Sequence, residues 1–219
     1  MLTTVLLIAG FAAGVTGAWS PCGLSMVDTL APGGYARNLR TSLAACATFA
    51  LGALGGGALT FGGLALAGAA LGAGGPAAVG AAAVGAVAAA VAEARGLRIV
   101  PQIRRQVPES WRRRLPVALA AAGYGLLLGL GFTTFVLSFA VWALAGASIA
   151  LGDPALGVAI GLAFGAGRAL PVVCLAPAAG TDRGGAITAA MCERPQILLG
   201  LRRVDAAALA ALALALGIA

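Results

Sequence analysis

The sequence contains neither histidine nor lysine, and all 14 of its basic residues are arginine. The lack of histidine excludes haem ligation by imidazole, histidine-based zinc or copper sites and imidazole proton relays. Charged residues are also scarce, at 10% of the 219, whereas 61% are hydrophobic and the mean hydropathy is +1.00. A soluble domain of this length could not cover so much apolar surface, so the composition predicts an integral membrane protein in contact with a lipid bilayer.

Other signatures are missing as well. The chain has no Cys-x-x-Cys-His sequence and no phosphate-binding glycine loop between a predicted strand and helix, which argues against haem attachment and nucleotide binding. The sequence therefore predicts no cofactor and no resident metal. The net charge of +7 does not indicate nucleic-acid binding, because the arginines flank apolar segments, where they set membrane topology and contact anionic lipid.

No basic residue precedes Arg37, so residues 1–27 lack the positively charged start of a secretory signal. They are expected to be a retained membrane span. Charge-free runs predict five more spans, at 42–70, 76–94, 116–148, 154–177 and 204–219. The fourth is long enough to be tilted or broken. The last has 16 residues, about 24 Å against a hydrocarbon core of roughly 30 Å, unless its helix begins earlier, near Pro195.

Thirteen of the 14 arginines lie in the first, third and fifth connectors, which places those connectors in the cytoplasm and both termini outside. The spans form two sets of three, in residues 1–94 and 116–219, separated by an arginine-rich connector at 95–115. Three is odd, so the second set enters the membrane in the opposite sense. The expected fold is an all-α membrane protein of six transmembrane helices arranged as two inverted repeats, in a bacterial inner membrane.

The first predicted span ends in Ser20-Pro21-Cys22-Gly23. The proline removes a backbone donor and bends the helix, and such a break is tolerated in lipid where it is buried in protein or lines a cavity. Ser20, Pro21 and Gly23 are therefore candidates for a helix break and cavity. Residues 17–22 overlay weakly on 129–134, which makes Thr133 and Thr134 the corresponding candidates in the second half.

Three segments, Ser20-Pro21-Cys22-Gly23, the glycine-spaced Phe49–Gly55 and Gly167-Arg168-Ala169-Leu170-Pro171, resemble the CcdA/DsbD transmembrane family, the transmembrane region of cytochrome c biogenesis proteins. The resemblance implies an electron carrier. Such a protein accepts electrons from cytoplasmic thioredoxin and reduces an extracytoplasmic thioredoxin-like or apocytochrome acceptor. It uses one cysteine in the first span and one in the fourth.

The chain departs from this pattern because its fourth span has no cysteine, and Thr133 and Thr134 occupy the counterpart positions. Cys174 is the preferred alternative partner for Cys22, since both are expected near the cytoplasmic side, and these two are the candidate catalytic residues. Each cysteine can also be a small packing residue, above all Cys46. Cys192 can be an exposed thiol with no role.

Arg168 lies within the fifth predicted span, where a charge is costly unless it is paired or reaches the interface. It can line a cavity, where it binds an anion or favours the thiolate of Cys22, or it can extend along the helix to the inner interface. Asp28 is either its partner or a polar cap.

The function predicted from these features is thiol–disulfide electron transfer with a missing or unusual second cysteine. Two alternatives stay open: a transporter of small solutes or metal ions, and a redox-inactive membrane partner protein. Proton coupling has few candidates, because all acidic residues are expected at or near connectors. They are Asp28, Glu93, Glu109, Asp153, Asp182, Glu193 and Asp205.

Overall fold

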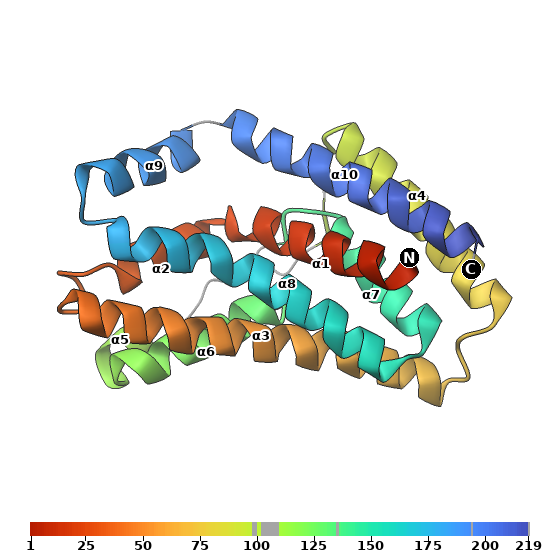
Figure 1. Cartoon of the computed structure of the whole chain (residues 1–219), viewed down its shortest axis with the longest axis horizontal. Helices are drawn as coiled ribbons and strands as arrows, with labels where there is room; N and C mark the ends of the chain where they lie inside the picture. The colour runs from red at the N-terminus through yellow and green to blue at the C-terminus, as the bar shows by residue number, and fades with distance from the viewer. Residues whose placement is uncertain (98–99, 102–109, 135, 194, 219) are drawn as a thin grey trace.

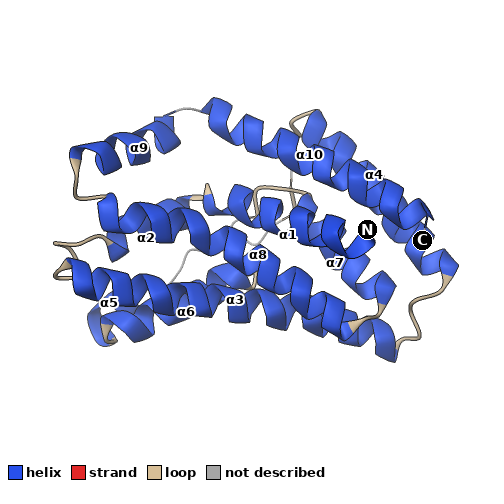
Figure 2. Cartoon of the chain, viewed as in Figure 1, coloured by secondary structure: helices blue, strands red, loops and turns tan. Residues whose placement is uncertain are grey.

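The computed structural model of the chain describes residues 1–97, 100–101, 110–134, 136–193 and 195–218, and it confirms an all-helical fold (Figures 1 and 2). The helices are α1 (Leu2–Ala18), α2 (Pro21–Leu30), α3 (Leu39–Ala70), α4 (Pro76–Ala94), α5 (Trp111–Arg114), α6 (Val117–Gly129), α7 (Ala140–Leu151), α8 (Pro154–Leu175), the 3₁₀ turn η1 (Ala176–Ala178), α9 (Asp182–Glu193) and α10 (Pro195–Ile218). Within the described ranges, the β contacts are limited to one isolated bridge between Pro32 and Ala36.

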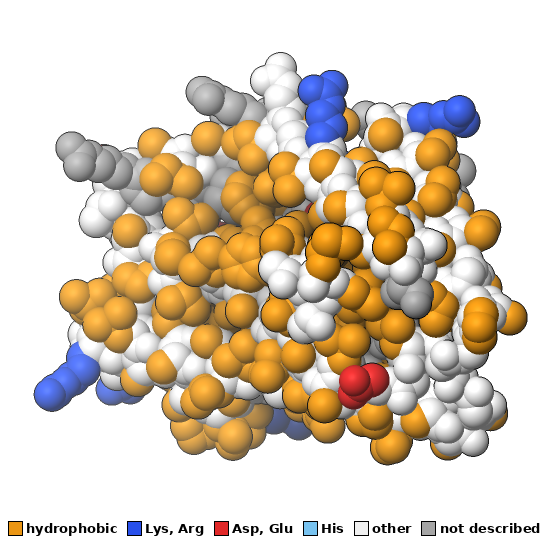
Figure 3. Space-filling model, turned by 45° about the vertical axis from the view of Figure 1, so that its right-hand side comes forward, with side chains coloured by type: hydrophobic (Ala, Val, Ile, Leu, Met, Phe, Trp, Pro, Cys, Tyr) orange, Lys and Arg blue, Asp and Glu red, His pale blue; other side chains and the backbone are white. Residues whose placement is uncertain are grey.

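Three helical segments are long and apolar enough to cross a membrane: α3, α4 and α8 with its continuation to Ala178. A fourth candidate is the pair α1 and α2, which meet at a bend of 74° and count together as one broken span. The face shown in Figure 3 agrees with a membrane setting, since hydrophobic side chains cover most of it and arginines project at its edges. The chain is thus a helical membrane protein.

Two predicted spans have different bounds in the structure. The run at 116–148 is broken, because α6 ends at Gly129 and α7 begins at Ala140. Gly131, with a φ of +75°, turns the chain out of the helix just after that end. The last helix begins at Pro195 and has 24 residues, not 16, because it continues straight through Arg202 and Asp205, which were expected in or beside a connector.

The middle of the bundle is the pair α3 and α8, which touch backbone to backbone. A Cβ added to Gly57 would lie 2.1 Å from the carbonyl oxygen of Gly161, and one added to Gly161 would lie 2.1 Å from that of Gly57. Small residues permit this approach, the usual means of helix association in lipid. In the same manner α1 packs on α8 through Gly14, and α6 packs on α3 through Gly129.

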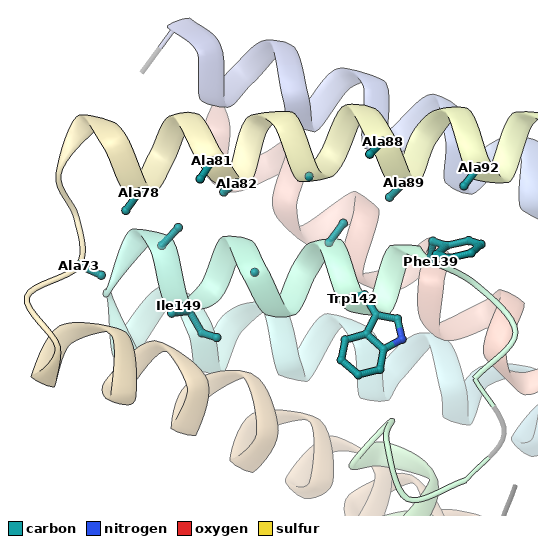
Figure 4. Close-up of a pocket in the computed structure, with 14 residues that line it drawn as sticks. Ala73, Ala78, Ala81, Ala82, Ala88, Ala89, Ala92, Phe139, Trp142 and Ile149 are labelled. Atoms are coloured by element: carbon teal, nitrogen blue, oxygen red, sulfur yellow. The ribbon is translucent and has the colours of Figure 1, made fainter. Parts of the chain in front are cut away.

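Helices α4 and α10 form a second layer that covers α1 and α7, as Figure 1 shows. A groove of about 600 Å³ opens between α4 and α7, with Phe139 and Trp142 near one end and alanines of α4 above them (Figure 4). Its lining is apolar, so the groove adds no polar site to the bundle.

Candidate functional site

The break between α1 and α2 is built by Ser20, Pro21 and Gly23. Ser20 is the N-cap of α2, and its hydroxyl accepts a hydrogen bond from the Gly23 N–H at 3.3 Å. Pro21 is the first residue of the helix, where its fixed φ and missing N–H are tolerated. Gly23 is needed because a Cβ there would lie 2.0 Å from the carbonyl oxygen of Ala18. The motif thus ends one helix and starts another at a sharp angle.

The proline also frees a carbonyl group. In a continuous helix the carbonyl of Gly17 would accept from the N–H of residue 21, and Pro21 has none. The Gly17 oxygen instead accepts from the Ser20 N–H at 3.2 Å and from Nη1 of Arg168 on α8 at 2.5 Å. Gly17 leaves the room for this contact, since a Cβ there would lie 2.7 Å from the Arg168 Cζ.

Arg168 is buried inside the protein, with 0% of its side chain surface exposed, and it is the largest fully buried side chain described. Its Cζ lies 5.5 Å from the centre of the Phe164 ring, at cation–π distance. This position contradicts the alternative in which the side chain extends to the inner interface. Asp28 is exposed and makes no ion pair with Arg168 in the described structure, so it is not the partner.

The Arg168 guanidinium has unused donors. Its Nε and Nη2 make no hydrogen bond to any described residue, and neither does the buried Nε1 of Trp19 beside the break. Such groups are costly to bury unless a ligand or water binds them. Arg168 is also within electrostatic range of Cys22. The site is therefore a buried guanidinium with unsatisfied donors, at the break in the first span.

The cysteines are distributed differently from the predicted pair. Cys22 is buried, at 5% exposed, in a cluster with Cys46, Val27 and Tyr124. Cys174, the preferred partner of Cys22, is exposed on α8, and both thiols are free. The side chain of Cys192 lies outside the described residues. In the described part of the chain, no three Cys, Asp or Glu side chains gather to hold a metal ion.

Thr133 and Thr134 lie in the segment between α6 and α7, which is the break in the second half. The Thr133 hydroxyl donates to the carbonyl oxygen of Leu127 at 2.6 Å, so it holds the end of α6 in place. The Thr134 hydroxyl is buried and has no hydrogen-bond partner among the described residues. Both halves therefore place polar groups at a broken helix.

The prediction that every acidic residue lies at or near a connector agrees with the position of Glu93 and is wrong for Asp205, which lies near the middle of α10; both side chains are buried. Glu93 in the last turn of α4 is 2% exposed, and Asp205 in α10 is 1% exposed. The missed signal is periodicity. Asp205 shares a buried helical stripe with Leu209, Leu212 and Leu216, at the 3–4 spacing that faces one side of a helix.

No family model matches the chain, and no solved structure matches it. It is similar to the methylamine utilization protein MauF of several bacteria. The identity is 38% over 175 residues with the protein of Paracoccus versutus, covering 77% of this chain and 63% of that protein. It is 37% over 178 residues for Paracoccus denitrificans (78% and 63%) and 33% over 186 residues for Methylophilus methylotrophus (78% and 62%). The chain thus spans about 63% of the length of these relatives.

These relatives overturn the predicted activity. They are named for methylamine utilization, so the expectations of a thiol–disulfide electron carrier and of a place in cytochrome c biogenesis are wrong. The structure offers a reason for the error. The Ser20-Pro21-Cys22 motif serves here to break a helix and free the Gly17 carbonyl for Arg168, a use that needs no second cysteine.

Proposed function

We propose that the chain is an integral membrane component of a methylamine-utilization system. The observation that carries this proposal is its 33–38% identity, over about three quarters of its length, to proteins of that name in four bacteria. The chain covers less than two thirds of the length of those proteins, so the proposal concerns the aligned part alone. The role proposed here belongs to the membrane-embedded portion.

The proposed architecture is six spans in two inverted repeats, with both termini extracytoplasmic in a bacterial inner membrane. Three features support it. Each half begins with a broken helix, α1–α2 or α6–α7. The central pair is α3 with α8, and each member packs against the broken helix of the other half. The arginines fall in alternate connectors, as the positive-inside rule requires.

Reporter fusions test this architecture. A cytoplasmic reporter should be active after Gly34 and within the 95–115 connector, and an extracytoplasmic reporter after Gly74 and Gly152. The same location on both sides of α3 would contradict the arrangement, because it would mean that this helix does not cross.

The proposed working part is the Arg168 site. A buried guanidinium with two unpartnered nitrogens, Nε and Nη2, next to a helix break, suits recognition of an anionic group such as a carboxylate. The positive charge has no acidic partner in the described structure, so a bound anion would neutralise it.

Complementation tests the overall role. A Paracoccus denitrificans strain without its MauF protein would receive a chimera in which this chain replaces the 178 aligned residues of the relative. We expect restored growth on methylamine, with growth on succinate and ammonium as the control. A chimera that reaches the membrane at the normal level and leaves the strain unable to use methylamine would refute the proposal.

A further inference from the structure

A second group of buried charges lies where α4, α7 and α10 meet. The Arg202 Nε donates to Glu93 Oε2 at 2.5 Å, and its Nη2 donates to the carbonyl oxygen of Leu97. The other Glu93 oxygen accepts from the backbone N–H of Phe139, at the start of α7. Glu93 and Arg202 therefore satisfy each other and neutralise each other's charge.

Asp205, one helical turn after Arg202, has no such partner. It is 1% exposed, and neither carboxylate oxygen accepts a hydrogen bond from a described residue. The hydroxyls of Thr16 on α1 and Ser138 before α7 lie near enough to interact with it. The Thr16 hydroxyl is itself buried and makes no hydrogen bond within the described residues. The Ser138 oxygen accepts from the Ala140 N–H, which leaves its proton free to donate.

The charges in this group do not balance. Glu93 and Arg202 cancel, so the carboxylate of Asp205 is left with one uncompensated negative charge in the protein interior. The charged groups that face it are Glu93 from α4 and Arg202 from α10. Helices α1 and α7 contribute hydroxyls and have no charged side chains. A buried carboxylate in such surroundings is stable only when a positive charge joins it.

We propose that Asp205 is the binding site for one monovalent cation, with the hydroxyls of Thr16 and Ser138 as its neutral partners. The cation is a proton or a small alkali or ammonium-type ion. A proton would turn the carboxylate into a donor to one hydroxyl, and an ion would take oxygen ligands from all three side chains. This inference does not depend on the proposed role in methylamine utilization.

The site adjoins the one at the helix break. Thr16, which faces Asp205, directly precedes Gly17, whose carbonyl accepts from Arg168. The end of α1 therefore lies between a site for a cation and a site for an anion.

The test uses the full chain in lipid nanodiscs, as wild type, Asp205→Asn and the control Asp28→Asn, which changes an exposed carboxylate. Infrared difference spectra over a pH titration detect a buried protonated carboxyl group. Thermal unfolding at high pH is compared in sodium, potassium and methylammonium chloride, with a bulky organic cation as the reference at equal ionic strength.

A carboxyl band that Asp205→Asn removes and Asp28→Asn keeps identifies a proton as the occupant. A saturable rise in the unfolding temperature with one of the small cations, absent in Asp205→Asn, identifies that ion. In the second case Thr16→Val should weaken the apparent affinity about tenfold, the worth of one hydrogen bond. If wild type shows neither a buried carboxyl band nor an ion-specific rise, the proposal is wrong, and this readout needs no variant.

Discussion

Among the residues that the structure describes, two arginines are buried, and they are held in different ways. Arg202 lies against Glu93 and a backbone carbonyl, so its charge is neutralised within the protein. Arg168 donates one hydrogen bond to a backbone carbonyl and lies over the ring of Phe164. The described residues offer it no acidic partner. A paired charge can be explained by folding alone, whereas an unpaired one is a cost that folding does not explain. This contrast is why the proposed site is built on Arg168 and not on Arg202.

Among the variants that test this contrast, Glu93→Gln is expected to have the largest effect on stability. The change removes the carboxylate that accepts from Arg202 Nε, and Asp205, which faces the same guanidinium, makes no hydrogen bond to it in the described structure, so the free energy of unfolding should fall by about 3–5 kcal/mol. Equilibrium unfolding in bicelles measures it, with Asp28→Asn as the control for loss of an exposed carboxylate. A loss of less than about 1 kcal/mol would show that the pair is not a structural unit.

Replacement of each arginine by methionine separates the two roles. Arg202→Met leaves Glu93 buried without its positive partner and should lower the free energy of unfolding by about 2–4 kcal/mol. Arg168→Met removes an unpaired charge and should leave the free energy of unfolding unchanged or slightly higher. In the complementation strain, Arg168→Met should abolish growth on methylamine. Equal destabilisation by the two variants would show that Arg168 is a structural residue like Arg202.

A smaller effect is expected when the Arg168 guanidinium is displaced but not removed. In Gly17→Ala the new Cβ meets the far end of a flexible side chain, so the helices stay packed while the hydrogen bond to the Gly17 carbonyl is lost. The expected cost is about 1–2 kcal/mol, with slower growth on methylamine. The control Gly63→Ala, which points into open space on α3, should be neutral or gain up to about 1 kcal/mol. Full growth with Gly17→Ala would show that this contact does not position the site.

The smallest effect is expected at the cap of α2. Ser20→Ala removes the acceptor of the Gly23 N–H and should cost about 1 kcal/mol, while Ser20→Asn should keep most of the stability. The same unfolding assay resolves the difference. If Ser20→Ala and Ser20→Asn are equally stable, the break is held by Pro21 and packing and not by the cap.

The sequence predicts the parts of this fold that depend on local chemistry. The limits of α4 and α8 follow from Pro76, Pro154 and the glycines before or around them, and the first break follows from Pro21. The burial of Arg168 could not be predicted, because it depends on Gly17, which is distant in sequence but adjacent in space. The sequence alone predicts Asp205 beside a connector, because a charge near the end of an apolar run suggests one. The buried stripe that Asp205 shares with the leucines of α10 can be recognised only once the helix is known to begin at Pro195.

The length of α3 has a consequence for the surrounding membrane. Its 32 residues measure about 48 Å, against a hydrocarbon core of roughly 30 Å. Its first turn carries the exposed Arg40 and a polar cap at Asn38, and its exposed leucines run from Leu43 to Leu66, so the apolar part that lipid must cover is about 36 Å long. A tilt of about 34°, above the average of about 20°, would be needed to immerse this part in a core of that thickness. The protein should therefore be sensitive to lipid chain length, with its highest stability in bilayers thicker than average.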